Sequence, residues 1–318
     1  MKTRIGIVGY GNLGKAVEQT ILANPKVCLV AIFSRRTIKS RFGTKVELYD
    51  NISDYKNKID IMLLCGSSKN DLESQTAEVL RYFDVINTFD THSKIFSEYK
   101  KLNKIANTTK HRALICTGWD PGLFSVVRAL FLAIGKSNPV SFWGKGVSMG
   151  HSDAIRQIPY VDDGLQFTVP IQESIKMAKM GIDNNGPKHE RICFVCAEEK
   201  RHKEIERNIK NIPNYFKGQP TKVNFVSPEK IMKLKQNMGH KGFVFESFKT
   251  TSGLKSQMEF KISTRSNPEF TAAIMTAYIN AVINLKNSNQ CGCFTPIDIP
   301  AKFLFEDSKY IEVLKTIC

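Results

Sequence analysis

Three glycines near the start of the sequence have the spacing of a phosphate-binding turn. Gly9, Gly11 and Gly14 form the pattern G-x-G-x-x-G within GYGNLG. The first permits a tight turn, the second lets a pyrophosphate approach the backbone, and the third lets a helix pack closely on a strand. A purely structural turn is the alternative, but the flanking strand and helix patterns favour dinucleotide binding. We expect six residues to contact the dinucleotide: Gly9, Tyr10, Gly11, Asn12, Leu13 and Gly14.

Two arginines stand where NAD-dependent enzymes carry an acid. Those enzymes place Asp or Glu about 20 residues past the glycines, where it binds the ribose 2′-hydroxyl. Here that place holds Ser34, Arg35 and Arg36, within FSRR. A carboxylate would repel a 2′-phosphate, whereas guanidinium groups bind it with charge-assisted, bidentate hydrogen bonds and Ser34 can donate another. The segment therefore predicts NADP as the cofactor; a solvated basic turn is the alternative.

Small side chains follow the third apolar segment, DIMLLCG. Ligands of open parallel sheets bind at the carboxyl ends of the strands, so this segment should border the same crevice. Its side chains are suited to the close passage of a dinucleotide. We expect four residues here to contact the cofactor: Cys65, Gly66, Ser67 and Ser68.

Two carboxylates follow the fourth and fifth apolar segments. Asp90 lies in NTFDTH and Asp120 in TGWDPG. Because the arginines mark the adenosine end of the crevice, these acids belong at the nicotinamide end. Together they indicate recognition of a cationic group such as an ammonium, and we assign both as candidate catalytic residues that position water. Each alone has the alternative role of a helix N-cap.

The second half of the sequence offers polar residues of the opposite kind. Thr168, Arg191, His240 and Asn267 lie in or beside apolar segments, and Arg191 has the geometry to bind a carboxylate. A loop position is the default for His240. An N-cap role is the default for Asn267, which stands just before a helical pattern.

Apolar segments alternate with helical patterns up to about residue 120, which predicts an α/β fold with a Rossmann-type, doubly wound parallel sheet. Beyond residue 140 the strands alternate less regularly, which predicts a second, α+β domain with an antiparallel or mixed sheet. We expect a nucleotide-binding domain over 1–120, completed by helices within 268–318, and a dimerisation and substrate domain over 121–267. The expected strands are 4–10, 27–34, 60–66, 84–90, 112–118, 140–149, 164–170, 191–198, 221–227, 243–249 and 258–264. The expected helical stretches are 12–24, 70–83, 93–106, 122–135, 202–216, 227–238, 268–285 and 300–318.

The net charge of +16 raises the possibility of a nucleic-acid partner. The lysines are scattered, however, and no basic stripe is interleaved with aromatic residues, so we expect a solvated surface and no nucleic-acid partner. No apolar run approaches the ~20 residues of a membrane span, and no signal peptide is evident. We therefore expect a cytoplasmic protein without a membrane partner.

Two further motifs match known functional patterns but do not indicate the corresponding functions. Cys193 and Cys196 match C-x-x-C, but their Phe-Val spacer alternates like a strand rather than forming the turn of a zinc site, so no metal is expected. Ser148 lies in a G-x-S-x-G pattern with His151 and Asp153 close by. No good helix is evident after it, and a triad assembles from distant parts of a chain, which argues against a serine hydrolase.

With these residues in place, the sequence resembles the meso-diaminopimelate D-dehydrogenase family over its whole length. The resemblance rests on GIVGYGNLGKAVE, FSRR, CGSSKNDLESQ, NTFDTH, TGWDPGLFSVVRAL, FWGKGVSMGHSDAIRQI and SNPEFTAA. It implies a homodimer that uses NADP to deaminate the D-centre of meso-2,6-diaminopimelate oxidatively and reversibly, giving L-2-amino-6-oxopimelate and ammonia, in lysine biosynthesis.

The resemblance also implies a substrate site. Asp90, Trp119 and Asp120 would surround the reacting D-centre, and Asp90 and Trp119 would also touch the cofactor. Met149 departs from the family, in which many members carry Gln, and a methionine cannot donate an amide hydrogen bond from this position. The implied substrate-binding residues are Asp90, Trp119, Asp120, Trp143, Met149, Gly150, Thr168, Arg191, His240 and Asn267.

Two other functions fit parts of the sequence. One is another NADP-dependent Rossmann oxidoreductase, such as a D-amino-acid dehydrogenase, a sugar dehydrogenase or a dihydrodipicolinate-reductase-like enzyme. The basic run of the last and the Glu-Lys-Pro motif of sugar dehydrogenases are both missing. The other is a non-catalytic NADP(H) sensor, which would not need paired acids at the nicotinamide end.

Overall fold

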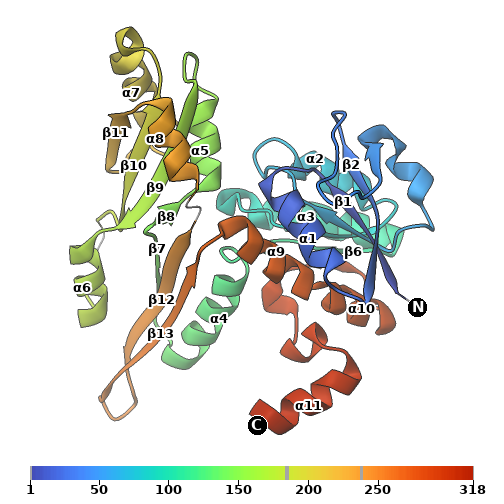
Figure 1. The fold of residues 1–318 in the computed structure, drawn as a ribbon. Coiled ribbons are helices and arrows are strands. Elements are labelled where there is room, and N and C mark those ends of the chain that lie inside the picture. Colours follow the sequence, from blue (N-terminus) through green and yellow to red (C-terminus); the bar gives the residue numbers. More distant parts are fainter. Residues whose placement is uncertain (1, 183–185, 237–238, 318) are drawn as a thin grey trace. The chain divides into compact units, whose positions relative to one another are not determined.

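The structure, a computed structural model, describes residues 2–182, 186–236 and 239–317. It divides into two units (Figure 1), one of Met1–Val126 with Pro268–Cys318 and one of Val127–Asn267. The helix α4 (Leu123–Gly135) runs from the first unit into the second. Within the described residues, no helix is long and apolar enough to cross a membrane.

The apolar segments of the first unit form a parallel sheet, as predicted, and two strands that were not predicted extend it to seven. Its order is β14-β6-β5-β4-β1-β2-β3, which contains the Rossmann order 3-2-1-4-5-6. Both faces are covered, so the strands are apolar on both sides. The strands are β1 (Thr3–Val8), β2 (Val27–Ser34), β3 (Val46–Leu48), β4 (Ile61–Leu64), β5 (Asp84–Asn87), β6 (Arg112–Leu114) and β14 (Gly292–Phe294).

Two apolar clusters cover the two faces of this sheet. Met62 and Leu64 belong to the cluster that includes Leu102 of α3, while Ile5 belongs to the cluster that includes Met275 of α9. The expected helix 268–285 is two helices, because the backbone at Tyr278 has ψ −1 and the second helix begins after it. The helices of this unit are α1 (Asn12–Leu22), α2 (Leu72–Val79), α3 (Ile95–Thr109), α9 (Asn267–Ala277), α10 (Ile279–Asn287) and α11 (Asp307–Ile317), with short 3₁₀ helices over Tyr49–Tyr55, His92–Lys94, Pro296–Asp298 and Ala301–Leu304.

The second unit holds two small sheets. One is mixed, in the order β11-β10-β9-β8, and the other is antiparallel, in the order β13-β12-β7. The expected strand 140–149 breaks in two because Gly144 has φ +113, a conformation that L-residues rarely adopt. The strands are β7 (Val140–Trp143), β8 (Gly146–Val147), β9 (Asp163–Pro170), β10 (His189–Cys196), β11 (Thr221–Phe225), β12 (His240–Lys249) and β13 (Lys255–Thr264). The helices are α5 (Met149–Arg156), α6 (Gln172–Met180), α7 (His202–Lys210) and α8 (Pro228–Lys235), with a 3₁₀ turn at Glu199–Arg201. Residues 237–238 of the expected stretch 227–238, and residue 318, lie outside the described residues.

Candidate functional site

The glycine-rich turn between β1 and α1 has the geometry that a pyrophosphate requires. Gly9 has φ +88, and its N–H donates to the carbonyl of Phe33 at 2.9 Å. A Cβ on Gly14 would lie 2.2 Å from the Gly9 oxygen, so only glycine lets α1 start this close to the turn. A Cβ on Gly11 would meet nothing within 4 Å, and the first turn of α1 holds no acidic side chain. The turn therefore presents an open, positively polarised helix end to an anion.

The basic segment after β2 is held by a residue whose role the sequence did not indicate. Arg35 Nη2 lies 2.6 Å from Asp71 Oδ1, and the second carboxylate oxygen of Asp71 accepts a hydrogen bond from Ser67 N–H at 3.0 Å. Ser34 Oγ accepts a hydrogen bond from Arg36 N–H at 3.2 Å. Both arginines are exposed. Asp71 stands directly before α2, and nothing in its local pattern indicates an arginine partner.

The loop after β4 lies directly against the glycine-rich turn. Cys65 N–H donates to the carbonyl of Val8 at 2.8 Å, and a Cβ on Gly9 would be 3.4 Å from Cys65 C and Gly66 N. Burial raises the pKa of the Cys65 thiol to about 12, so it is a neutral packing group. Ser68 Oγ accepts a hydrogen bond from Asp90 N–H at 3.0 Å, which joins this loop to the next.

The two candidate acids follow adjacent strands of the first unit. Thr117 N–H and Oγ1 both donate to the carbonyl of Asn87 at 2.9 Å, and Asp90 and Asp120 each lie three positions beyond that joined pair. Asp90 keeps exposed surface, yet desolvation by the surrounding protein raises the pKa of its carboxyl, against opposing effects of Ser68 and His92. Trp119 is only 9% exposed and packs edge-on against Phe124.

In the second unit, a half-buried arginine contacts a neutral polar group. Arg191 on β10 donates through Nη1 to Thr168 Oγ1 on β9 at 3.0 Å. Its Nε is buried without a hydrogen-bond partner, and no carboxylate pairs with it anywhere in the described part of the chain. Burial lowers the pKa of its guanidinium. A partly desolvated cation without an anion costs free energy, so this place is suited to an anionic group.

Two buried histidines belong to the same unit. His240 is the first residue of β12 rather than a loop residue, which corrects the default expectation; desolvation lowers its pKa to about 4. His189 was not anticipated from the sequence; its Nε2 accepts a hydrogen bond from Trp143 N–H at 2.8 Å, and desolvation lowers its pKa to about 3. Both are neutral at pH 7, and His189, which interacts with the charge of Arg191, therefore does not repel it.

The remaining predicted substrate residues lie at element starts. Met149 is the half-buried first residue of α5, and Gly150 follows it; a Cβ on Gly150 would lie 3.7 Å from the ring of Tyr215. The preceding Ser148 N–H donates to the carbonyl of Gln166 at 3.0 Å, and Gln166 Nε2 donates to Thr168 Oγ1 at 3.2 Å. Asn267 is the first residue of α9.

The G-x-S-x-G segment differs from expectation in one respect. A helix, α5, does begin directly after Ser148, so the expectation that none follows was wrong. Ser148 Oγ lies 2.8 Å from His151 Nδ1, but Asp153 pairs with Arg156 instead of His151. Ser148 has φ −88, an ordinary value without the strain of a nucleophile elbow. Asp153 therefore does not complete a triad with Ser148 and His151.

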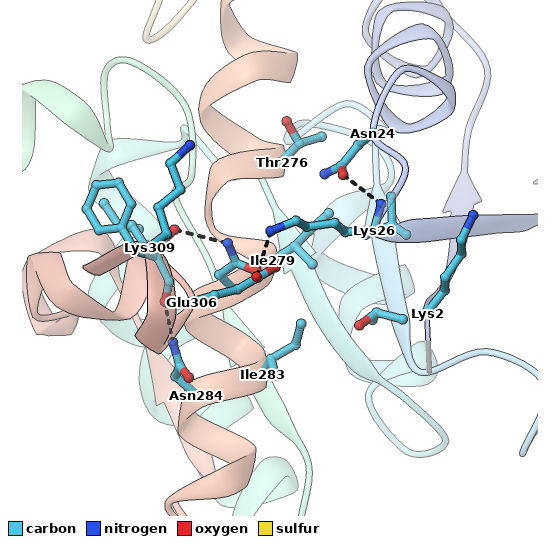
Figure 2. A pocket seen from close by; sticks show the side chains of 14 residues that line it. Lys2, Asn24, Lys26, Thr276, Ile279, Ile283, Asn284, Glu306 and Lys309 are labelled. Atoms are coloured by element: carbon cyan, nitrogen blue, oxygen red, sulfur yellow. Dashed lines mark hydrogen bonds and ion pairs between the residues drawn. The ribbon is translucent and has the colours of Figure 1, made fainter. Parts of the chain in front are cut away.

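A separate pocket of about 820 Å³ lies in the first unit (Figure 2). It is lined by Thr3 and Val27, the first residues of β1 and β2. It therefore lies at the amino-terminal ends of the strands, whereas the glycine-rich turn lies at their carboxyl ends. Lys26 Nζ lies 2.6 Å from Glu306 Oε2 across it. None of the predicted site residues lines this pocket, so it is not the candidate active site. Among the described residues, no group of three or more His, Cys, Asp or Glu side chains is arranged to hold a metal.

The sheet order and the glycine-rich turn place the chain in the class of dinucleotide-binding α/β proteins. A family model for the diaminopimelic acid dehydrogenase C-terminal domain matches residues 118–266. The meso-diaminopimelate D-dehydrogenase of Ureibacillus thermosphaericus is 42% identical over 309 residues, which cover 94% of each chain. The chain belongs to the meso-diaminopimelate D-dehydrogenase family.

Solved structures agree over the full length. The DAP dehydrogenase of C. glutamicum, in complex with DAP, has a TM-score of 0.94 at 33% identity, covering 99% of both chains. An engineered D-amino acid dehydrogenase bound to NADP+ has a TM-score of 0.92 at 31% identity, covering 100% of both. The α/β fold with a second sheet domain is therefore confirmed.

Proposed function

We propose that this protein catalyses the reversible, NADP-dependent oxidative deamination of the D-centre of meso-2,6-diaminopimelate. The products are L-2-amino-6-oxopimelate, ammonium, NADPH and a proton, with one water consumed. The names of its relatives and the DAP bound to one of its structural neighbours support this substrate. We place the reaction in lysine biosynthesis and in the cytoplasm.

The observation that carries the proposal is Arg191. A half-buried guanidinium that donates to Thr168, has a buried Nε and has no carboxylate partner among the described residues favours an anion that offsets its desolvation. A substrate carboxylate supplies one with charge-assisted hydrogen bonds. Neutral His240 and Thr168 add donors or acceptors without adding charge. We assign this group to the distal, L-configured end of the substrate.

The first unit fits NADP. The open face at Gly11 and the unopposed start of α1 suit a pyrophosphate, while Ser34, Arg35 and Arg36 suit a 2′-phosphate. When bound, NADP⁺ supplies the hydride acceptor. The loop of Cys65 to Ser68 adjoins the turn and would border the dinucleotide.

The acids Asp90 and Asp120 have the charge to hold the ammonium group of the D-centre. Asp90 is desolvated, so its attraction for an ammonium is stronger than that of a freely solvated aspartate. Trp119, which is buried and precedes Asp120 in the sequence, would exclude water there. Loss of a proton from the ammonium frees the lone pair that forms the imine as hydride leaves. The acids then position the water that hydrolyses this imine.

We also propose that the protein is a homodimer. In the second unit, α4 exposes Leu130, Leu132 and Ile134, which are 56%, 47% and 53% exposed. The edge strand β13 adds the half-buried Met258 and Phe260. Exposed apolar side chains such as Leu130 and Ile134, four positions apart on one face of α4, are typical of a protein–protein contact, and a second copy would cover them. Replacing Leu130 and Ile134 by Glu should give a monomer in sedimentation experiments. The matched variant Leu22→Glu, at a residue 50% exposed on α1, should leave the dimer intact.

The test of the main proposal follows NADPH formation from meso-diaminopimelate. The L,L and D,D isomers and D-lysine serve as comparisons, because each alters one end of the doubly zwitterionic substrate. Turnover should be fastest with the meso isomer. NADP⁺ binding without turnover of any isomer would instead support a non-catalytic NADP(H) sensor, and preferred turnover of D-lysine would support a general D-amino-acid dehydrogenase.

A further inference from the structure

A buried carboxylate beneath the glycine-rich turn has no place in the chemistry described above. Glu18, on α1, is 0% exposed. One of its oxygens accepts a hydrogen bond from the Tyr10 hydroxyl and the other from Ser40 Oγ. Burying a carboxylate is costly unless hydrogen bonds and a favourable potential offset the lost hydration. The chain thus retains a carboxylate whose burial costs free energy, and its hydrogen-bond partners identify the segments that it holds in place.

The partners of Glu18 connect the glycine-rich turn to the loop of residues 35–45. Tyr10 lies inside the turn, and its hydroxyl oxygen accepts a hydrogen bond from Arg41 N–H at 2.7 Å. Ser40 Oγ accepts hydrogen bonds from Phe42 N–H at 3.1 Å and Thr44 N–H at 2.9 Å. One buried carboxylate therefore fixes both the turn and the centre of the loop.

The loop needs such a fixed point because it is highly charged. Residues 35–45, RRTIKSRFGTK, contain five cations and no acid, and they start at the arginines that end β2. Like charges in a short segment repel one another and extend it. Hydrogen bonds through Ser40 and Tyr10 oppose that extension, and the negative charge of Glu18 offsets part of the positive field.

We propose that Glu18 is a positioning residue that sets the preference for NADP over NAD. Acting through Ser40 and Tyr10, it holds the loop of residues 35–45 so that its cations face the 2′-phosphate. This inference rests on the proposed use of NADP. It assigns the preference to an ordered loop as well as to the two arginines that we propose for the phosphate.

The test compares binding of 2′,5′-ADP and 5′-AMP by calorimetry, and KM values for NADP⁺ and NAD⁺, in the intact protein. Glu18→Gln should weaken 2′,5′-ADP binding and raise KM for NADP⁺ about fivefold, the effect of one lost hydrogen bond. Ser40→Ala, which removes the three hydrogen bonds of Ser40 Oγ, should have at least that effect. In Ser40→Ala, which leaves the hydrogen bond between Tyr10 and Glu18 in place, values for 5′-AMP and NAD⁺, and kcat, should stay within about twofold. Ser40→Thr keeps the hydroxyl and should restore the preference. Thr20→Val, which removes a hydroxyl elsewhere on α1, should change neither ratio.

Equal weakening for both nucleotides, or an unchanged ratio in Ser40→Ala, would overturn the inference. Because Ser40 lies in a partly exposed loop, its variants address the question even if Glu18→Gln fails to fold. The two proposals fail differently. If the wild-type protein does not prefer 2′,5′-ADP to 5′-AMP, the proposed use of NADP fails; if it does and the Ser40 variants retain that preference, only the role of Glu18 fails.

Discussion

Arg35 Nη2 lies 2.6 Å from Asp71 Oδ1, so the loop after β4 holds the first arginine of the basic segment after β2. The two residues are 36 positions apart in the sequence. Asp71 is largely covered and is fixed in turn by Ser67 N–H. The arginine that we assign to the 2′-phosphate thus has a defined position, but it also has an anionic neighbour that would repel that phosphate.

This arrangement predicts that Arg35→Ala is more harmful than the loss of one phosphate contact. A charge-assisted hydrogen bond contributes about 1.5–3 kcal/mol, so KM for NADP⁺ should rise at least about tenfold. The variant also leaves the Asp71 carboxylate unpaired beside the phosphate. Adding Asp71→Asn should therefore recover about threefold, within the range of about 0.2–1 kcal/mol for an exposed pair.

Steady-state kinetics with both cofactors measures this effect. Glu306→Gln breaks an ion pair of equal length at the amino-terminal ends of the strands. In the Arg35→Ala background it is the matched control, and it should leave KM for NADP⁺ unchanged. Recovery with NAD⁺ as large as that with NADP⁺ would show that Asp71 acts on folding of the loop rather than on the 2′-phosphate.

Asp90 is predicted to control the acidic limb of the pH profile. Desolvation raises the pKa of its carboxyl, so the carboxylate is lost at a higher pH than in an ordinary aspartate. As pH falls through that pKa, the group becomes neutral and its attraction for the substrate ammonium disappears. In the pH profile of kcat/KM for meso-diaminopimelate, the pKa of the acidic limb should lie above the usual aspartate range. The limb should vanish in Asp90→Asn. That variant should also lose about 30-fold or more at neutral pH. A limb that persists in Asp90→Asn would assign it to another group.

The sequence was sufficient to predict the parts of the fold that depend on local pattern. Strands such as Val27–Ser34 are apolar and β-branched, and Gly9, Gly11 and Gly14 have fixed roles in a strand–turn–helix unit, so their positions follow from short-range rules. The third glycine shows this well, since a Cβ at Gly14 would collide with the Gly9 carbonyl.

Long-range partners could not be predicted in this way. In the sequence, Asp71 is an ordinary acid at a helix start and Glu18 an ordinary helical glutamate. Only the fold shows that their partners are Arg35 and Ser40. The prediction of one strand over 140–149 was wrong because the left-handed backbone at Gly144 depends on a neighbouring strand. A Cβ on Gly144 would lie 2.1 Å from the Thr168 oxygen. The predicted contacts of site residues with substrate and cofactor stay predictions.

The buried histidines predict that the protein loses stability in mild acid. His189 and His240 have folded-state pKa values of about 3 and about 4, below the ordinary value of about 6.5. Because the unfolded chain binds the protons more tightly, the stabilisation is complete above pH ~6.5 and is lost as pH falls from there toward the folded values. Within that window, each histidine should lower the free energy of unfolding by about 1.4 kcal/mol per pH unit. Denaturant unfolding at pH 7 and pH 5 measures the loss. His189→Gln, which keeps an acceptor for Trp143 N–H, should reduce the pH dependence; an unchanged dependence would contradict the low pKa.

Met149 is predicted to relax discrimination against apolar substrates. It is a half-buried thioether that follows Ser148, and hydrogen bonds lead from Ser148 through Gln166 to Thr168 in the proposed carboxylate pocket. A glutamine here could donate to a polar substrate but would lose hydration without compensation beside an apolar one. Met149→Gln should therefore raise the ratio of kcat/KM for meso-diaminopimelate to that for D-norleucine about fivefold or more. Met149→Leu keeps an apolar side chain of similar volume and should leave the ratio unchanged. If Gln and Leu have the same effect, the size of the side chain rather than its polarity controls selectivity at this position.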